Sequence, residues 1–161
     1  MNSPTILHWL TLGSALGSGL IAGVFFAFSV FIMKALARLP AAQGVAAMQS
    51  INITVINPWF LMTFIGTAIA CLSLLIVSVV SLTVSQSGLR IAASLLYLGG
   101  TILVTGMANI PRNNALAALA PDSSDSATLW TNYLKTWTRW NHVRTVSSAA
   151  ASVLFMIALK S

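Results

Sequence analysis

The stretch PWFLMTFIGTAIACLSLLIVSVVSLTV, residues 58–84, decides the fold class, because it contains no charged residue over a length that can cross a bilayer. About 20 consecutive apolar residues are enough to span the hydrocarbon core as a helix. Asn57 and Pro58 introduce the stretch with the capping residue and first-turn proline typical of a helix start. Trp59 beside them is typical of the membrane–water interface. Residues 58–84 are therefore predicted to form a transmembrane helix.

Three further apolar runs flank this stretch, and the composition of the chain agrees with them. Only 6% of the 161 residues are charged, whereas soluble domains carry about 25%. The predicted fold is an all-α, integral membrane four-helix bundle, formed as a single transmembrane domain by residues 1–161. The predicted spans are residues 5–33, 58–84, 90–108 and 143–159.

Helical structure is also expected outside the spans. Residues 35–57 are moderately apolar and predict a short interfacial helix between spans one and two. The last helix is expected to begin near Ser126 and to reach Lys160, so it extends well beyond the length that a span requires. Pro111 is expected to end or bend the third helix, because proline lacks a backbone donor.

The eight basic residues give the chain a net charge of +6. They flank apolar runs and form no stripe dense enough to bind nucleic acid, so no nucleic-acid partner is expected. Arg90 and Lys160 fall on one side of the predicted bundle. The other side holds Lys34, Arg38, Arg112, Lys135, Arg139 and Arg144. Since cytoplasmic loops carry excess positive charge, we predict a multi-pass cell-membrane protein with both termini on the non-cytoplasmic side.

Several chemistries are disfavoured by what the apolar runs lack. They contain no acidic residue, and the chain has only Asp122 and Asp125, so carboxylate-driven transport and a carboxylate metal site are not expected. His8 and His142 begin spans one and four. They should therefore lie on opposite faces, about 30 Å apart, and cannot ligate one haem iron together. His142 alone could still serve as the single axial ligand of a haem.

The most organised pattern in the chain is an aromatic and polar stripe on the last helix. Spacings of three and four residues place its members on one helical face. These members are Trp130, Tyr133, Trp137, Trp140, Asn141 and Arg144. An aromatic belt followed by a snorkelling cation would explain most of the pattern without any site.

Polar groups at membrane depth nevertheless need partners, because burying them unpaired is costly. The predicted topology supplies partners on the same side of the membrane, where span two begins and span three ends. The partners are Asn57, Asn109, Arg112 and Asn113. Together with the tryptophans they predict a pocket for a flat, hydrophobic aromatic molecule.

Two segments carry a resemblance to a known family. The segment Asn109-Ile110-Pro111-Arg112-Asn113-Asn114-Ala115-Leu116, with the later Trp130, Trp137 and Trp140-Asn141-His142-Val143-Arg144-Thr145, resembles the anthrone oxygenase-like family of small four-span membrane proteins. The resemblance implies oxidation of an anthrone-type tricyclic to its quinone by molecular oxygen. The chain shows no flavin or nicotinamide fingerprint, so no cofactor is expected, and molecular oxygen would be the co-substrate.

This interpretation assigns expected roles to the residues of the two segments. His142 is the expected general base, because a histidine pKa lies near neutrality, and Arg144 is expected to stabilise a phenolate-like anion. Both are thus expected catalytic residues. Tryptophans would stack on the substrate and amides would orient its oxygens. The expected substrate-binding residues are Asn57, Asn109, Arg112, Asn113, Trp137, Trp140 and Asn141.

Two other interpretations stay open at this point. The chain could be a non-catalytic four-helix membrane protein that binds a small hydrophobic ligand or a partner, or a single-haem or quinone-linked redox protein. Gly13 and Gly17 lie four residues apart in the first span. Such small residues let helices approach closely, either within one chain or between two copies in a homo-oligomer.

Overall fold

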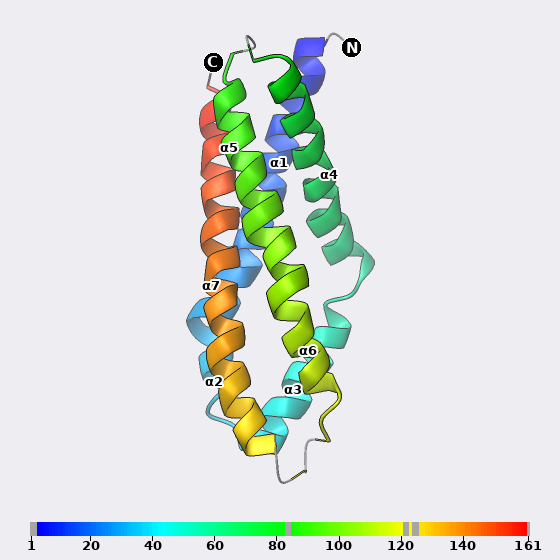
Figure 1. Cartoon of the computed structure of the whole chain (residues 1–161), viewed down its shortest axis with the longest axis vertical. Coiled ribbons are helices and arrows are strands. Elements are labelled where there is room, and N and C mark those ends of the chain that lie inside the picture. The colour runs from blue at the N-terminus through cyan, green and yellow to red at the C-terminus, as the bar shows by residue number, and fades with distance from the viewer. Residues whose placement is uncertain (1–2, 83–84, 121–122, 124–125, 161) are drawn as a thin grey trace.

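The computed structural model describes residues 3–82, 85–120, 123 and 126–160. Four long helical rods lie side by side in it (Figure 1). They begin with α1 (Ser3–Ala27), α4 (Pro58–Val80), α5 (Ser87–Tyr97) and α7 (Ser126–Ala158). α1 packs against α4 and α7, and α5 packs against the same two helices, so the four rods close a ring around one core. The predicted all-α four-helix bundle is confirmed.

Three helical stretches in the described part of the chain are long and apolar enough to cross a membrane: Thr5–Leu36, Pro58–Val80 and Ser87–Ala117. The fourth predicted span, residues 143–159, falls in α7. This helix does not reach the same apolarity, because Arg144 and several inward-facing serines dilute its hydrophobic residues. A fourth crossing of the membrane by α7 stays a prediction.

Two of the rods contain π-helical turns. α1 continues through η1 (Phe28–Ile32) into α2 (Met33–Leu36), and α5 continues through η2 (Leu98–Leu103) and η3 (Thr105–Asn109) into α6 (Ile110–Ala117). Such turns insert an extra residue into the helix and occur often at functional sites. In both rods they lie just before the segment that reaches the lower end of the bundle (Figure 1).

The third rod is longer than the predicted span of residues 90–108. It begins at Ser87 and continues past Pro111 to Ala117, so of the two expected effects of Pro111, an end or a bend of the helix, the end is not observed. The proline comes directly after the π-helical turn η3, where the regular helical hydrogen bonding is already interrupted, so the rod accommodates a residue without an N–H. α4 in turn ends at Val80. The predicted end of the second span, residues 83–84, lies outside the described residues.

The predicted short helix between the first two spans is present as α3 (Ala41–Thr54), at the end of the bundle opposite to both termini (Figure 1). α3 packs against α7 and α6. Gly44 makes this packing possible, since a Cβ at that position would lie 2.7 Å from the Trp130 ring.

The apolar core is divided into two clusters along the bundle. One cluster lies between the four long rods and includes Phe25, Phe64 and Phe155. The other lies under α3 and includes Met48 and Trp137. At this lower end α3 packs on the bundle in place of α4, which begins only at Pro58. The candidate site lies between the two clusters, where this change of helix occurs.

Candidate functional site

A cavity of about 330 Å³ lies between α1, α3, α4, α7 and the α5–α6 rod. Its wall is mainly aliphatic and aromatic, with four polar side chains: Asn52, Thr105, Asn113 and Arg144. Ligand cavities typically measure about 300–1,000 Å³ and combine apolar walls with a few convergent polar groups. This cavity has both properties.

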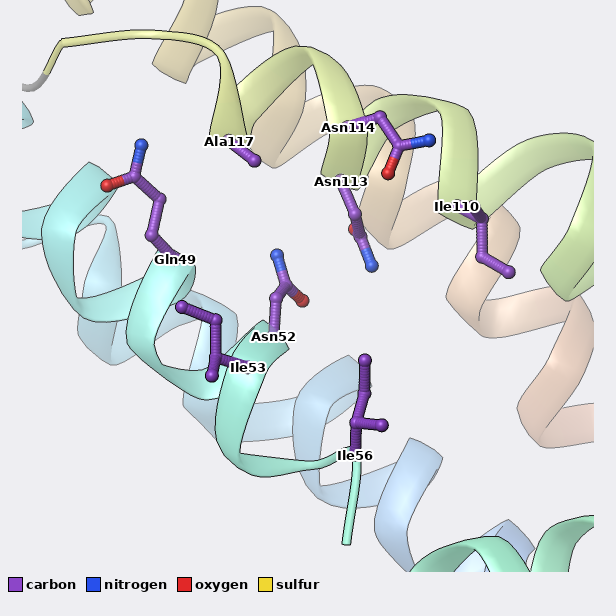
Figure 2. Close-up of a pocket in the computed structure, with 8 residues that line it drawn as sticks. All are labelled: Gln49, Asn52, Ile53, Ile56, Ile110, Asn113, Asn114 and Ala117. Atoms are coloured by element: carbon purple, nitrogen blue, oxygen red, sulfur yellow. The ribbon is translucent and has the colours of Figure 1, made fainter.

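An outer pocket of about 650 Å³ adjoins the cavity between α3 and α6 (Figure 2). The two share four lining residues: Asn52, Ile56, Ile110 and Asn113. The outer pocket is richer in amides, because Gln49 and Asn114 also line it. The site therefore has an apolar inner cavity and an amide-lined outer pocket.

Arg144 supplies the only cation in the wall of the inner cavity among the described residues. Its side chain is 5% exposed. Its guanidinium carbon lies 4.0 Å from the Phe25 ring centroid and 5.1 Å from that of Trp137, so the cation lies over aromatic faces. Its Nε is buried and has no hydrogen-bond partner. No carboxylate side chain accompanies it in the part of the chain that the structure describes.

Asn141 holds the Arg144 guanidinium in place. Its Oδ1 accepts a hydrogen bond from Arg144 Nη2 at 2.7 Å. Its Nδ2 donates to the Phe25 carbonyl at 2.7 Å and to Ser29 Oγ at 2.8 Å. Thr105 Oγ1 accepts a further bond from Arg144 Nη1 at 3.2 Å. Asn141 is fully buried and lies behind the arginine rather than in the cavity wall, so it orients Arg144.

Asn113 connects the aromatic stripe of α7 to the cavity. Its Oδ1 accepts hydrogen bonds from Tyr133 Oη at 2.9 Å and from Trp137 Nε1 at 2.7 Å. The Tyr133 ring stacks between Trp130 and Trp137, with centroid separations of 5.7 and 6.0 Å. Trp130, Tyr133 and Trp137 of the predicted stripe thus face inward with their rings stacked along the helix. The Tyr133 O–H and the Trp137 N–H share one amide oxygen as their acceptor.

The structure brings three of the residues expected from the sequence to the cavity wall, namely Asn113, Trp137 and Arg144. Asn109 is buried next to them and donates to the Trp137 carbonyl at 3.3 Å. Together with Asn141 it lies behind the wall, so these two amides support the site without lining it.

Four expected residues lie away from the cavity. Asn57 caps α4, where its Oδ1 accepts from the Phe60 N–H at 3.1 Å. Arg112 donates to the carbonyl of its own helix at Ala108, at 2.6 Å. Trp140 is 38% exposed. His142 is also exposed, because it is rotated about 100° from the inward-facing Asn141 on the helix. The structure therefore does not place His142 where it could remove a proton from a ligand in the cavity.

Sequence reasoning missed most residues that line the cavity, among them Phe25, Asn52 and Thr105. Asn52 is the polar residue of the apolar segment Ile51-Asn52-Ile53 and could have been noticed as such. Phe25 and Thr105 carry no signal in the sequence. They reach Arg144 through the packing of α1 and η3 on α7.

The fold and the cavity define the class: an all-helical protein with three helices long and apolar enough to cross a membrane and an apolar cavity around a buried cation. Residues 59–154 match the model of the anthrone oxygenase family. The chain belongs to this family, and the resemblance seen in the sequence is confirmed. The matched residues include Asn113, Trp137 and Arg144. Searches of the curated proteins and of the solved structures gave no match.

Proposed function

We propose that the protein is a membrane-embedded oxygenase that converts an anthrone-like polycyclic phenol to its quinone with molecular oxygen, and that the substrate binds in the inner cavity. The buried Arg144 cation carries this proposal. It lines the cavity among aromatic rings and has no carboxylate partner in the described residues. Burying an unpaired charge is costly, and an anionic ligand would offset that cost.

The reaction balances without an external reductant. The methylene group between the aromatic rings loses a proton, and the resulting anion is delocalised onto the ketone oxygen. The anion passes one electron to oxygen, and the carbon radical and superoxide then combine into a peroxide. Loss of the second methylene hydrogen as a proton, with cleavage of the O–O bond, leaves a carbonyl. One anthrone and one O₂ give one quinone and one water.

The contribution of the protein in this scheme is electrostatic. A positive charge in an apolar cavity favours the ionised form of a neighbouring acid, so Arg144 lowers the pKa of the bound substrate and stabilises the anions that follow. Its contacts with Asn141 and Phe25 hold it in place before the substrate arrives. The described lining residues include neither a histidine nor a carboxylate, and the released proton passes to water.

Oxygen uptake and quinone formation by the purified protein with a simple anthrone test the proposal. The wild-type protein is expected to exceed the autoxidation rate measured without protein. Arg144→Gln is expected to lose roughly 10²- to 10³-fold of the enhancement, the usual cost of removing a group that stabilises a transition-state anion. The matched control is Arg139→Gln on the exposed side of the same helix, which should keep the wild-type rate.

Two results would contradict the oxygenase. One is a wild-type rate no faster than autoxidation with several anthrones, which would favour a non-catalytic protein that binds hydrophobic ligands. The other is an Arg144→Gln protein, folded as judged by its unfolding transition, that turns over at the wild-type rate.

A further inference from the structure

We infer that Asn52 of α3 and Asn113 of α6 form a binding subsite for a ketone oxygen, at the junction of the inner cavity and the outer pocket. Both residues line both compartments. Their amides point toward each other's helix across the space between α3 and α6 (Figure 2). The subsite deepens the proposed function and rests on it for the identity of the ligand, a tricyclic aromatic ketone.

The orientation of the Asn113 amide is determined by its partners. Its Oδ1 accepts from both Tyr133 and Trp137, and an amide oxygen can accept two such bonds while its nitrogen only donates. The Nδ2 group must therefore point away from α7. Figure 2 shows this nitrogen directed into the space between α3 and α6. The wall thus presents a fixed N–H donor to a ligand.

Asn52 supplies the second donor. Its Nδ2 is buried and has no hydrogen-bond partner, and a buried donor without an acceptor destabilises the protein. The Asn52 amide approaches the Tyr133 hydroxyl, but this approach does not reach hydrogen-bond geometry. An acceptor oxygen from a ligand at the junction would satisfy this nitrogen. Asn52 and Asn113 each bring an amide N–H group to the junction, and such N–H donors can bind a carbonyl oxygen and stabilise charge on it.

The position of the subsite also orients the ligand. Arg144 lines the inner cavity and not the outer pocket, and Trp137 lies between Asn113 and Arg144, with its Nε1 bonded to the first and its ring near the second. A tricyclic ketone with its oxygen at the amide pair directs the opposite carbon of its central ring into the inner cavity. The amides then share the charge of the ketone oxygen, while Arg144 stabilises anions that form at the other end.

The test compares two ligands that differ in the ketone alone. Xanthone carries a ketone on its central ring, and xanthene has a methylene in its place. Their affinities for the purified wild-type protein are measured by quenching of tryptophan fluorescence under argon, so that no oxidation takes place. We expect xanthone to bind roughly 10-fold more tightly than xanthene, since each net hydrogen bond contributes several-fold.

Asn52→Leu has nearly the same size without the donor and should reduce this preference to about 3-fold or less, with xanthene affinity unchanged. Asn52→Asp, which replaces the donor by an acceptor, is a second variant that does not depend on burying an apolar side chain and should also lose the preference. Asn132→Leu, on an exposed position of α7, is the matched control and should keep it.

A wild-type protein without preference for xanthone, or a preference that survives in both Asn52 variants, would overturn the subsite. These results are distinguishable from failure of the oxygenase. A ketone preference that depends on Asn52, together with no anthrone oxidation, leaves the subsite standing and removes the reaction. Anthrone oxidation together with an unchanged ketone preference in the Asn52 variants supports the reaction and removes the subsite.

Discussion

Asn113 both satisfies buried hydrogen-bond donors and lines the candidate site. One amide oxygen satisfies both the Tyr133 hydroxyl and the Trp137 indole N–H, which are otherwise surrounded by the apolar cluster under α3. The same side chain lines both compartments of the site. If the proposed ligand binds there, stability and ligand binding are coupled at this position.

Asn113→Leu should lower the free energy of unfolding by about 2–4 kcal/mol, because two buried donors lose their acceptor and each unsatisfied donor costs about 1–3 kcal/mol. Asn114→Leu is the matched control, since Asn114 is exposed and surface substitutions usually change stability by no more than about 0.5 kcal/mol. Denaturant unfolding in detergent, followed by tryptophan fluorescence, gives both values. Equal losses for the two variants would refute the account of Asn113.

His142→Gln should turn over anthrone at the wild-type rate, because His142 is exposed on the outer face of α7. The comparison is kcat/KM for oxygen-dependent quinone formation across the neutral pH range. A drop of tenfold or more, with the loss of a pH dependence centred near the histidine pKa, would return His142 to the mechanism.

The sequence predicted part of the site because helical periodicity is visible in it. Spacings of three and four residues identified the buried face of α7, including Trp137, Asn141 and Arg144. His142, which follows Asn141 directly, was expected to be catalytic, and the structure shows it exposed instead. Helical periodicity could not separate Asn141 from the cavity wall, because that distinction depends on how α1 approaches α7. Asn52 could have been noticed as a polar residue in an apolar segment, but its place in the site could not, because no local pattern determines how α3 docks on the bundle.

At the scale of helices, the π turns and the close packing of the rods place these side chains. η1 follows Phe25, whose carbonyl accepts from Asn141, and η3 contains Thr105, which accepts from Arg144. Residues in or near the two π turns thus contact Arg144 or the Asn141 amide that holds it. No sequence signal that we identified predicted these π turns. η3 ends at Asn109, just before Pro111, where the sequence led us to expect that the helix ends or bends.

The α5–α6 rod approaches α7 closely at Gly100, and this contact can be tested. A Cβ at Gly100 would collide with the Ser147 side chain, whereas a Cβ at Gly99 would have no neighbour within 4 Å. Gly100→Ala should therefore cost about 1–3 kcal/mol of unfolding free energy. Gly99→Ala should be neutral or stabilising by up to about 1 kcal/mol, because alanine is the better helix former.

Thermal unfolding of the two variants in the same detergent makes the comparison. Similar melting temperatures for Gly100→Ala and Gly99→Ala would show that the two helices are not in contact at this point.

For the whole molecule, composition and apolar run lengths predicted an all-helical bundle with helices of membrane-spanning length, and the structure agrees. The number of membrane crossings was harder to predict from hydropathy, because α7 buries serines and a cation that a hydropathy scale scores as polar. The division of the site into an inner cavity and an outer pocket could not be predicted from the sequence. It arises where α3 packs across the end of the bundle and α4 begins, and so depends on the packing of elements distant in sequence.

The central claim is that the buried Arg144 cation, which has no carboxylate partner among the described residues, ionises the substrate. The most direct measurement is a pH titration of anthrone bound to the purified protein in the absence of oxygen, with the anion followed by its absorbance. The account predicts that anthrone ionises at a lower pH when bound to the wild-type protein than in detergent alone, and that Arg144→Gln removes this shift while retaining bound anthrone. An identical titration in the two proteins would contradict the account, because Arg144 would then have no electrostatic effect on the ligand.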